Sequence, residues 1–249
     1  MDAEDTVTVI IATYNAERVL ENCLLSVLCQ THNAVEIVVR DGGSTDGTLS
    51  ILEKYGDKVR FVSEPDFGIG DAHQKGVEAA RGTWLYFLGA DDLIASPMAL
   101  EHMFAIFQDL GGKADIITAH ALYDDGRIYR SNKPHWLLMK NTIHHQGALY
   151  RRSLFNEKKY DTSLKVYYDY DFNIWARLNK KKFIHTEILL GLLGAGGLSD
   201  RPRFGNYLED MRVRARYLSG FELILFNAGS VLRFFYKKLR HSIGSSGSN

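Results

Sequence analysis

The chain has 249 residues, with 30 acidic and 30 basic side chains and 45% hydrophobic residues. This length allows one large domain or two small ones with a sizeable core, and a net charge of zero gives no electrostatic reason to expect a nucleic-acid partner. Acidic residues outnumber basic ones over residues 1–100, whereas basic residues predominate over residues 201–249. That asymmetry fits either a tail that faces a membrane or another anion, or a solvated helix face.

The cysteines and the N-terminus bear on the compartment. Cys23 and Cys29 are the only cysteines, and they fall six residues apart on different faces of a predicted helix, so we expect neither a disulfide nor a zinc site. The acidic start MDAEDT lacks the basic and then apolar pattern of a signal peptide. The uncharged run LILFNAGSVL is shorter than the ~20 residues of a spanning helix. We therefore expect a cytoplasmic protein.

Predicted strands and helices alternate over the first half of the chain. Apolar runs predict strands at residues 6–15, 35–41, 58–64, 83–88 and 114–119, and helical patterns separate these runs. Strands spaced in this way form parallel βαβ units with right-handed crossovers. The fold class is therefore α/β, with a parallel sheet flanked by helices.

The second half gives more mixed signals. We expect a hairpin around Asp125 and Gly126, a strand near residues 144–152, a helix over 169–178, one or two strands over 181–193, and two helices between residues 203 and 241 that break near Gly220. The last residues, GSSGSN, have the composition of a disordered tail.

Polar side chains follow the predicted strands where those strands end. In parallel sheets, ligands bind outside the carboxyl ends of the strands. That rule places the following residues along one rim of the sheet: Tyr14, Asn15, Asp41, Glu64, Asp91 and Asp92. The adjacent acids Asp91 and Asp92 either face water in a turn or hold a hard cation such as Mn²⁺ or Mg²⁺, which prefers carboxylate oxygens.

Two further segments have a chemical and a plain structural interpretation. The segment RDGGSTDGT, residues 40–48, contains two glycines that allow a tight turn near a nucleotide, or it is a βα turn without a ligand. Asp169 and Asp171 either stabilise the start of a predicted helix, or Asp169 is a general base. Neither G-x-G-x-x-G nor a Walker sequence occurs, which argues against dinucleotide oxidoreductases and P-loop NTPases.

Four pieces, in this order, resemble the family 2 inverting glycosyltransferases of the GT-A fold: VIIATYNAERVLENCLLSVLCQT, EIVVRDGGSTDGT, GVEAARGTWLYFLGADD and DYDFNIWARL. The resemblance covers most of residues 6–200, and HQGALYRRSLF and GGLS are similar to the branch that builds bacterial capsule, O-antigen and exopolysaccharide. It implies a Rossmann-like, mostly parallel sheet with a nucleotide-sugar-binding half at residues 1–118 and an acceptor-binding half at residues 119–200. Residues 201–249 would be a C-terminal helical segment and a disordered tail.

The resemblance also implies a reaction and its residues. Such an enzyme moves one sugar from a nucleotide-diphosphate sugar, by default a uridine diphosphate sugar, to a glycan or lipid-linked acceptor and inverts the anomeric carbon. Asp169 would take the proton from the acceptor hydroxyl, and Asp92 would bind the metal, Mn²⁺ or Mg²⁺. The donor would contact Thr13, Tyr14, Asn15, Asp41, Glu64, Lys75, Asp91 and Arg201.

Four positions depart from the pattern of this family. Gly42 stands where a second acid is usual, and Gly89 replaces an acid that often precedes the Asp pair. His73 occupies the place of a common arginine, whose charge either His73 or Lys75 would replace. Tyr168 occupies the place of a glutamate just before Asp169.

Acceptor and membrane contacts have weaker signals. His145 and Trp136 are candidates for acceptor binding, although structural packing explains both. Arg201 or Arg203 would close over the diphosphate, or they lie in a plain exposed loop. The basic and aromatic run RFFYKKLR would make a peripheral contact with the inner face of the cell membrane, or it is an ordinary packed helix with solvated lysines.

Two other functions stay open at this point. A nucleotidyltransferase that makes nucleotide-sugars would share the α/β nucleotide fold, but the chain lacks the glycine- and arginine-rich N-terminal signature of that class. A catalytically inactive relative that only binds nucleotide-sugars is the other alternative. The presence of Asp91, Asp92 and Asp169 argues against it.

Overall fold

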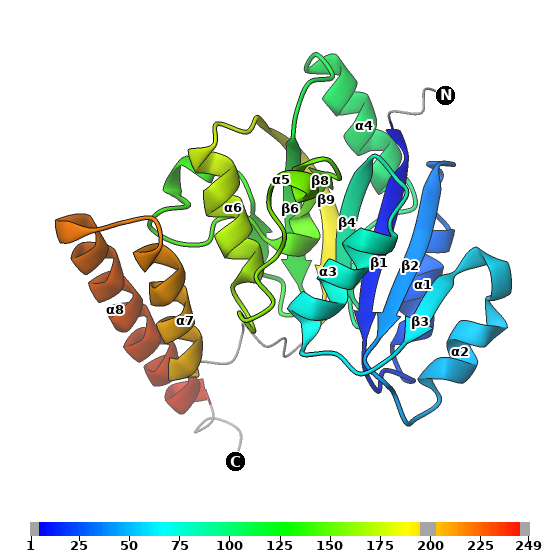
Figure 1. The fold of residues 1–249 in the computed structure, drawn as a ribbon, viewed down its shortest axis with the longest axis horizontal. Helices are drawn as coiled ribbons and strands as arrows, with labels where there is room; N and C mark the ends of the chain where they lie inside the picture. The colour runs from blue at the N-terminus through cyan, green and yellow to red at the C-terminus, as the bar shows by residue number, and fades with distance from the viewer. Residues whose placement is uncertain (1–4, 195–202, 245–249) are drawn as a thin grey trace.

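The computed structural model describes residues 5–194 and 203–244 of the chain. A nine-stranded sheet forms the centre of the molecule. Helices cover both faces of this sheet, and a pair of C-terminal helices stands at one side of the body (Figure 1).

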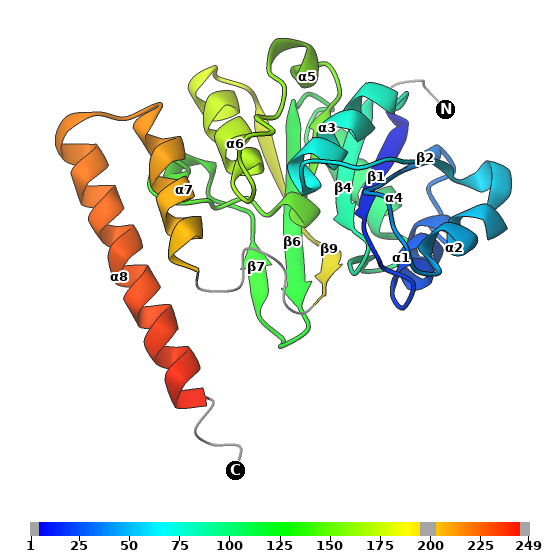
Figure 2. The same ribbon diagram turned by 60° about the horizontal axis from the view of Figure 1, so that its bottom comes forward.

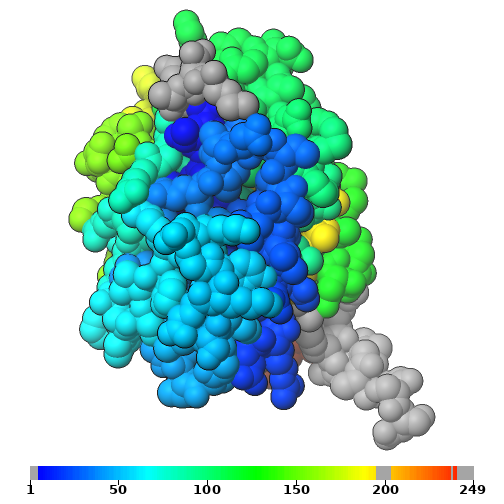
Figure 3. All heavy atoms as spheres, turned by 90° about the vertical axis from the view of Figure 1, so that its right-hand side faces the viewer, coloured from blue at the N-terminus to red at the C-terminus, as the bar shows by residue number. Residues whose placement is uncertain are grey.

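The N-terminal part follows the alternation that the sequence predicts. Its elements are β1 (Val7–Thr13), α1 (Leu20–Leu28), β2 (Val35–Asp41), α2 (Thr48–Lys54), a 3₁₀ helix (Gly56–Lys58), β3 (Arg60–Ser63), α3 (Ile69–Ala79), β4 (Trp84–Gly89), β5 (Leu93–Ile94) and α4 (Ala99–Asp109). Strands β3, β2, β1 and β4 lie side by side in parallel. Thr13 lies opposite Asp41 and Ala12 opposite Gly89, so the carboxyl ends of these strands meet at one edge. The first strands and helices, coloured blue to cyan, dominate the face in Figure 3.

The second part builds the rest of the sheet. Its elements are β6 (Ile116–Tyr123), β7 (Ile128–Arg130), 3₁₀ helices at Pro134–Trp136 and His145–Gly147, β8 (Ala148–Arg151), α5 (Leu154–Glu157), α6 (Tyr168–Leu178), β9 (Phe183–Leu193), α7 (Phe204–Ala215) and α8 (Gly220–Gly244). The strand order is β3-β2-β1-β4-β8-β6-β9-β5, with β7 paired to β6.

One point of the topology lies beyond what the sequence predicts. The strand over residues 114–119 does not extend the parallel series directly, because β8 inserts between β4 and β6 and is antiparallel to both. Strands β6 and β9 nevertheless run in the same direction as β1 to β4, so the sheet is mostly parallel. The predicted boundary between residues 118 and 119 falls inside β6, and both halves therefore share one sheet.

The core consists of two apolar layers, one on each face of the sheet. Side chains of a strand point alternately to opposite faces, and β1 shows this period clearly. Val9 and Ile11 pack in the layer beneath α1 and α4, whereas Ile10 packs in the layer beneath α3 and α6. All seven residues of β1 are buried, as the continuous apolar run in its sequence predicts.

A buried arginine ties the two C-terminal helices to each other. Arg214 of α7 is fully buried and donates hydrogen bonds to both carboxylate oxygens of Asp210 (3.0 and 2.9 Å) and to Ser230 Oγ of α8 (2.6 Å). Its guanidinium also donates to the carbonyl of Met139 (3.0 Å), which joins the pair to the body. The predicted helix break is confirmed at Gly220, where φ is 63°. Figure 2 shows α8 on the outer side of α7.

A helix that could span a membrane is absent from residues 5–194 and 203–244.

Candidate active site

The loop after β2 is organised around a buried carboxylate. Asp41 Oδ2 accepts hydrogen bonds from the backbone N–H of Gly43 (3.1 Å) and Ser44 (2.9 Å) and from Ser63 Oγ (2.6 Å). Asp41 is 2% exposed. Its carboxylate therefore fixes the shape of the loop through the protein's own donors, and a direct contact with a nucleotide stays a prediction.

The side chains after β1 border this same loop. Tyr14 is 63% exposed, so its ring is free to stack on a ligand. Asn15 has a positive φ of 48°, and its Oδ1 accepts a hydrogen bond from Thr45 N–H (2.8 Å). Thr13 is buried, and among the described residues its Oγ1 has no hydrogen-bond partner.

The structure gives a steric reason for Gly42. A Cβ atom at this position would lie 2.8 Å from Asp66 Oδ2 and 3.4 Å from the Tyr14 ring. A second acid, as the family resemblance leads us to expect here, would therefore require the Asp66 carboxylate to shift and would crowd the exposed tyrosine.

Lys75 and Glu64 pair with each other at the edge of the rim. Lys75 Nζ lies 3.1 Å from Glu64 Oε1 and 3.1 Å from Asp71 Oδ2, and Arg40 also contacts Glu64 (2.7 Å). The hydrogen bond from Lys75 is the main cause that holds the pKa of Glu64 below its ordinary value. These ion pairs neither support nor contradict a contact of Lys75 or Glu64 with a sugar donor, which stays a prediction.

The acid pair after β4 has one fixed and one exposed member. Asp92 is 5% exposed and accepts hydrogen bonds from Gly89 N–H (2.8 Å), Gln146 Nε2 (2.6 Å) and Gly194 N–H (3.2 Å). Burial, and then the neighbouring charge of Asp91, raise the pKa of Asp92 to about 6. Asp91 itself is exposed.

The same pair fits a hard divalent cation. A Cβ atom at Gly89 would lie 2.8 Å from Asp91 Oδ1 and 3.0 Å from Asp92 Oδ2, so both carboxylates converge over this glycine. Carboxylate oxygens suit Mg²⁺ or Mn²⁺, which complete their shells with substrate phosphates, and within the part of the chain that the structure describes neither Asp91 nor Asp92 forms an ion pair. A side chain at position 89 would require these two carboxylates to move, and an acid there would place a third negative charge beside them.

A second group of ligand-type side chains lies elsewhere on the sheet. His120 on β6 and His185 and Glu187 on β9 contact one another, with His120 Nε2 2.8 Å from Glu187 Oε2. These three residues are not among those that line the cleft described next.

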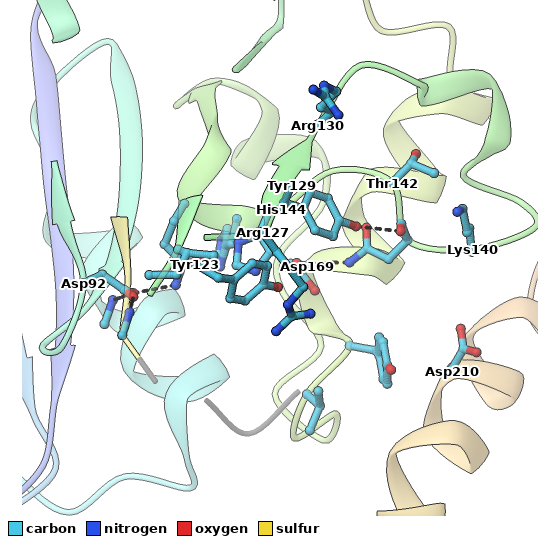
Figure 4. A pocket seen from close by; sticks show the side chains of 18 of the residues that line it. Asp92, Tyr123, Arg127, Tyr129, Arg130, Lys140, Thr142, His144, Asp169 and Asp210 are labelled. Carbon is cyan, nitrogen blue, oxygen red and sulfur yellow. Dashed lines mark hydrogen bonds between the residues drawn. The ribbon is translucent and has the colours of Figure 1, made fainter. Parts of the chain in front are cut away.

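A cleft of about 1280 Å³ opens beside the acid pair. Residues from both the N-terminal and the C-terminal halves of the chain line it. Asp91 and Asp92 line one end of this cleft, and Asp169 of α6 lines it farther along (Figure 4). Desolvation by burial raises the pKa of Asp169 to about 7, while Asn141 Nδ2 makes a long hydrogen bond to its Oδ2 (3.4 Å).

The structure separates the two acids that the sequence could not distinguish. Asp171 is fully buried away from the cleft and forms ion pairs with Lys158 (2.8 Å) and Arg216 (3.1 Å). The ion pair with Arg216 joins α6 to the C-terminal end of α7. Asp169, two residues earlier, is the member that faces the cleft.

Two of the four departures from the family pattern are in contact. His73 Nδ1 lies 3.0 Å from the Tyr168 hydroxyl, and both side chains are buried. Burial lowers the pKa of His73 to about 4, so the ring is neutral near pH 7 and does not supply the charge of an arginine. A neutral hydrogen-bonded pair therefore stands where the resemblance leads us to expect arginine and glutamate.

The two predicted acceptor residues occupy different surroundings. His145 lines the cleft but is buried, stacks on Phe87 (4.5 Å between centroids) and pairs with the Tyr160 hydroxyl (2.9 Å). Burial holds the pKa of His145 well below its ordinary value. Trp136 is 44% exposed and is not among the residues that line the cleft. Their role toward an acceptor stays a prediction.

The remaining predicted donor contact, Arg201, lies outside the described residues, as does the GGLS segment. The sequence missed two residues that shape the site. Gln146 holds Asp92, and its own carbonyl accepts a hydrogen bond from Tyr86 (2.8 Å). Asn141 contacts Asp169. Asn141 lies in a loop and Gln146 in a single turn of 3₁₀ helix, and both are far from their partners in sequence, so no periodic pattern marks them.

Solved structures share this architecture. The 1–349 fragment of TarS from S. aureus, in complex with UDP-GlcNAc, aligns with a TM-score of 0.70 and 22% identity over 93% of this chain and 73% of the fragment. The mannosyltransferase PcManGT from Pyrobaculum calidifontis, in complex with GDP-Man and Mn²⁺, aligns with a TM-score of 0.68 and 16% identity over 96% of this chain and 79% of its own. The chain spans 43% of the longer TarS chain. The fold is that of the GT-A glycosyltransferases.

Sequence relatives narrow this class to a family. The signature of glycosyl transferase family 2 matches residues 8–168. A PGL/p-HBAD biosynthesis glycosyltransferase of Mycobacterium bovis (strain BCG / Pasteur 1173P2) is 37% identical over 225 residues, which cover 84% of this chain and 85% of the relative. An uncharacterized glycosyltransferase of Rickettsia typhi is 31% identical over 196 residues, covering 73% of this chain and 61% of the relative. The chain belongs to glycosyltransferase family 2.

Proposed function

We propose that this glycosyltransferase moves one sugar from a nucleotide-diphosphate sugar to a hydroxyl of a glycan or lipid-linked acceptor, with inversion of the anomeric carbon, in bacterial polysaccharide synthesis. The observation that carries the proposal is the shared cleft, which places the Asp91–Asp92 pair and Asp169 around one volume. The pair suits a metal-bound diphosphate, and Asp169 suits a hydroxyl that loses a proton.

On the donor side, the chain would hold the nucleotide and its diphosphate in separate places. The exposed ring of Tyr14 would stack on the base, beside the loop that Asp41 organises. Asp92, oriented by three hydrogen-bond donors, and Asp91 would hold Mn²⁺ or Mg²⁺. A divalent cation bound there would supply Lewis-acid stabilisation of the departing diphosphate.

On the acceptor side, Asp169 would act as the general base. A carboxyl with a pKa of about 7 is half ionised at neutral pH and is well matched to proton transfer. As the acceptor oxygen attacks the anomeric carbon from the face opposite the nucleotide, Asp169 takes the hydroxyl proton. Asn141, through its contact with Oδ2, would keep the carboxylate turned to the acceptor.

A uridine diphosphate sugar is the favoured donor and a guanosine diphosphate sugar the second choice. The complex of the TarS fragment with UDP-GlcNAc supports the first, and the complex of PcManGT with GDP-Man and Mn²⁺ supports the second and the use of a metal. The acceptor side of the proposal includes a lipid-linked substrate.

Release of UDP from UDP-sugars, measured with Mn²⁺ and a panel of acceptors, tests this function. We expect turnover that requires a divalent cation and an anomeric configuration opposite to that of the donor. Pyrophosphate release from a sugar 1-phosphate and a nucleoside triphosphate would instead identify a nucleotidyltransferase. Donor binding without turnover with any acceptor or water would favour an inactive binding relative.

A further inference from the structure

Helix α8 carries a row of exposed apolar side chains. The row, called here the α8 stripe, consists of Phe221, Ile224, Leu225, Leu232, Phe235, Tyr236 and Leu239, each 53% to 76% exposed. With 3.6 residues per turn, these positions fall within about 120° of the helix circumference and extend over about 27 Å of its length. Exposed apolar patches of this size mark sites of interaction.

The α8 stripe is not the side of the helix that packs on the protein. Phe234, on the other side, contacts the rings of Phe204 and Tyr207 of α7 (5.2 and 5.3 Å between centroids). Ser230 accepts a hydrogen bond from the buried guanidinium of Arg214. Helix α8 is therefore anchored on its inner side, and its outer side remains uncovered in the described structure (Figure 2).

The charges of the same helix are almost all positive. Glu222 is the last acidic residue of the chain, and Arg233, Lys237, Lys238 and Arg240 follow it. Two copies of the chain that met through parallel α8 stripes would bring these positive charges together. Antiparallel copies would offer them Glu222 as the only acid of this helix. An anionic lipid surface complements the apolar stripe and the basic end at once.

We propose that the α8 stripe docks on the surface of an anionic lipid bilayer, with the apolar side chains inserted at the boundary between headgroups and acyl chains. Arg233 of α8, and Tyr236 at the edge of the α8 stripe, also line the cleft that contains Asp92 and Asp169. Docking would therefore bring the acceptor end of the cleft to the membrane, where a lipid-linked acceptor can reach Asp169 without leaving the bilayer. Only this last consequence rests on the proposed function.

Vesicle co-sedimentation of the full chain tests the docking without any catalytic step. We expect the protein to sediment with vesicles of phosphatidylcholine mixed with phosphatidylglycerol, and less with phosphatidylcholine alone. The double variant Leu232→Glu/Phe235→Glu should bind the anionic vesicles at least about a hundredfold more weakly, because two inserted side chains are lost. Lys238→Gln should weaken binding about fivefold, and mainly at low salt.

Leu110→Glu is the matched control, because Leu110 is 52% exposed just after α4 and lies outside the α8 stripe. This control should bind vesicles like the wild type, and thermal melting should show that all variants fold. Equal vesicle binding by the double variant and the control would overturn the proposal. So would a wild-type dimer that becomes monomeric in the double variant while neither binds vesicles, since the stripe would then face a second copy.

A thermal shift with UDP and Mn²⁺ separates this proposal from the proposed function. We expect the double variant to keep the same shift as the wild type, because the stripe lies outside the donor site. Vesicle binding by a protein that shows no UDP-dependent shift and no transfer would leave the docking intact and refute the proposed function.

Discussion

The two sides of the cleft assemble their side chains in different ways. At the ends of β1, β2 and β4, the candidate donor residues Thr13, Asp41 and Asp91 stand at the last strand residue or just after it, and the parallel pairing of the strands brings these ends together. On the other side, Asp169 comes from α6, Asn141 from a loop and Arg233 from α8. The first arrangement follows from local sequence, whereas the second depends on packing between distant segments.

The carboxylates on the two sides differ in how firmly the protein holds them. Asp92 accepts three hydrogen bonds from groups on β4, a 3₁₀ helix and the end of β9. Asp169 accepts a short hydrogen bond from the adjacent Tyr170 N–H (2.7 Å) and, among the described residues distant in sequence, a long one from Asn141 (3.4 Å). Burial raises the pKa of both carboxyls, to about 6 at Asp92 and to about 7 at Asp169, and the second value suits a group that carries a proton near neutral pH.

The largest effect is expected from removal of the candidate base. Asp169→Asn should lower kcat by about a hundredfold to ten-thousandfold, the usual contribution of general base catalysis, while the dissociation constant for UDP changes little. Asp171→Asn is the matched control on the same helix. It should lower the melting temperature, because Lys158 and Arg216 lose their partner, and leave kcat of the folded protein within a few-fold. A large loss of kcat in Asp171→Asn together with a small one in Asp169→Asn would contradict the assignment of Asp169 as the base.

The pH dependence of the reaction probes the same residue. Because the folded protein has a pKa of about 7 at Asp169, kcat should rise about tenfold per unit of pH below 7 and level off above it. This carboxyl has a pKa of about 4 in an unfolded chain. The folded protein therefore loses stability from this group as the pH rises from about 4 to about 7, and Asp169→Asn should melt higher than the wild type at pH 8. A flat rate profile between pH 5 and pH 8 would contradict this role.

A smaller effect is expected at the buried pair His73 and Tyr168, which lines the cleft. Tyr168→Phe removes the hydroxyl that contacts His73 and leaves a buried ring nitrogen without that partner. We expect the free energy of unfolding in urea to fall by about 1 to 3 kcal/mol. The double variant His73→Arg/Tyr168→Glu introduces the two residues that the family resemblance leads us to expect. It should have a higher free energy of unfolding than either single variant, His73→Arg or Tyr168→Glu. Additive losses in the double variant would mean that the two positions do not compensate each other.

The smallest effect concerns the loop of the donor side. Gly42→Asp should cost about 1 to 2 kcal/mol of stability and weaken UDP binding, because its Cβ would meet Asp66 and crowd Tyr14. Gly205→Asp serves as the control, since a Cβ at Gly205 meets no atom within 4 Å. Equal stability of the two variants would show that the loop has room for the acid that many relatives carry there.

The sequence was sufficient for the parallel part of the sheet and its rim, because apolar runs and turn residues mark each strand end there. It could not predict that β8 inserts between β4 and β6, since strand order across a chain reversal depends on packing. It predicted a strand over residues 144–152, whereas residues 145–147 form a 3₁₀ helix and the strand begins at Ala148. This irregular turn contains Gln146, the side chain that holds Asp92.

Single residues show the same limit within the site. Adjacent acids after a strand suggested either a water-facing turn or a cation site, and the structure brings both carboxylates over Gly89; the metal at Asp92 and the donor contact at Asp91 stay predictions. Spacing alone could not separate Asp169 from Asp171, because both fall in the first turn of one helix. Only tertiary contacts distinguish them, since Arg216 and Lys158, which neutralise Asp171, come from other parts of the chain.

The central claim is that the two sides of the cleft do different work, with the metal and the donor at Asp92 and the proton at Asp169. Calorimetric titration of UDP, with and without Mn²⁺, into Asp92→Asn and Asp169→Asn tests this division most directly. We predict that Mn²⁺ tightens UDP binding at least about tenfold in the wild type and in Asp169→Asn, and that Asp92→Asn loses this gain. A Mn²⁺ effect that survives in Asp92→Asn, or one that disappears in Asp169→Asn, would contradict the account.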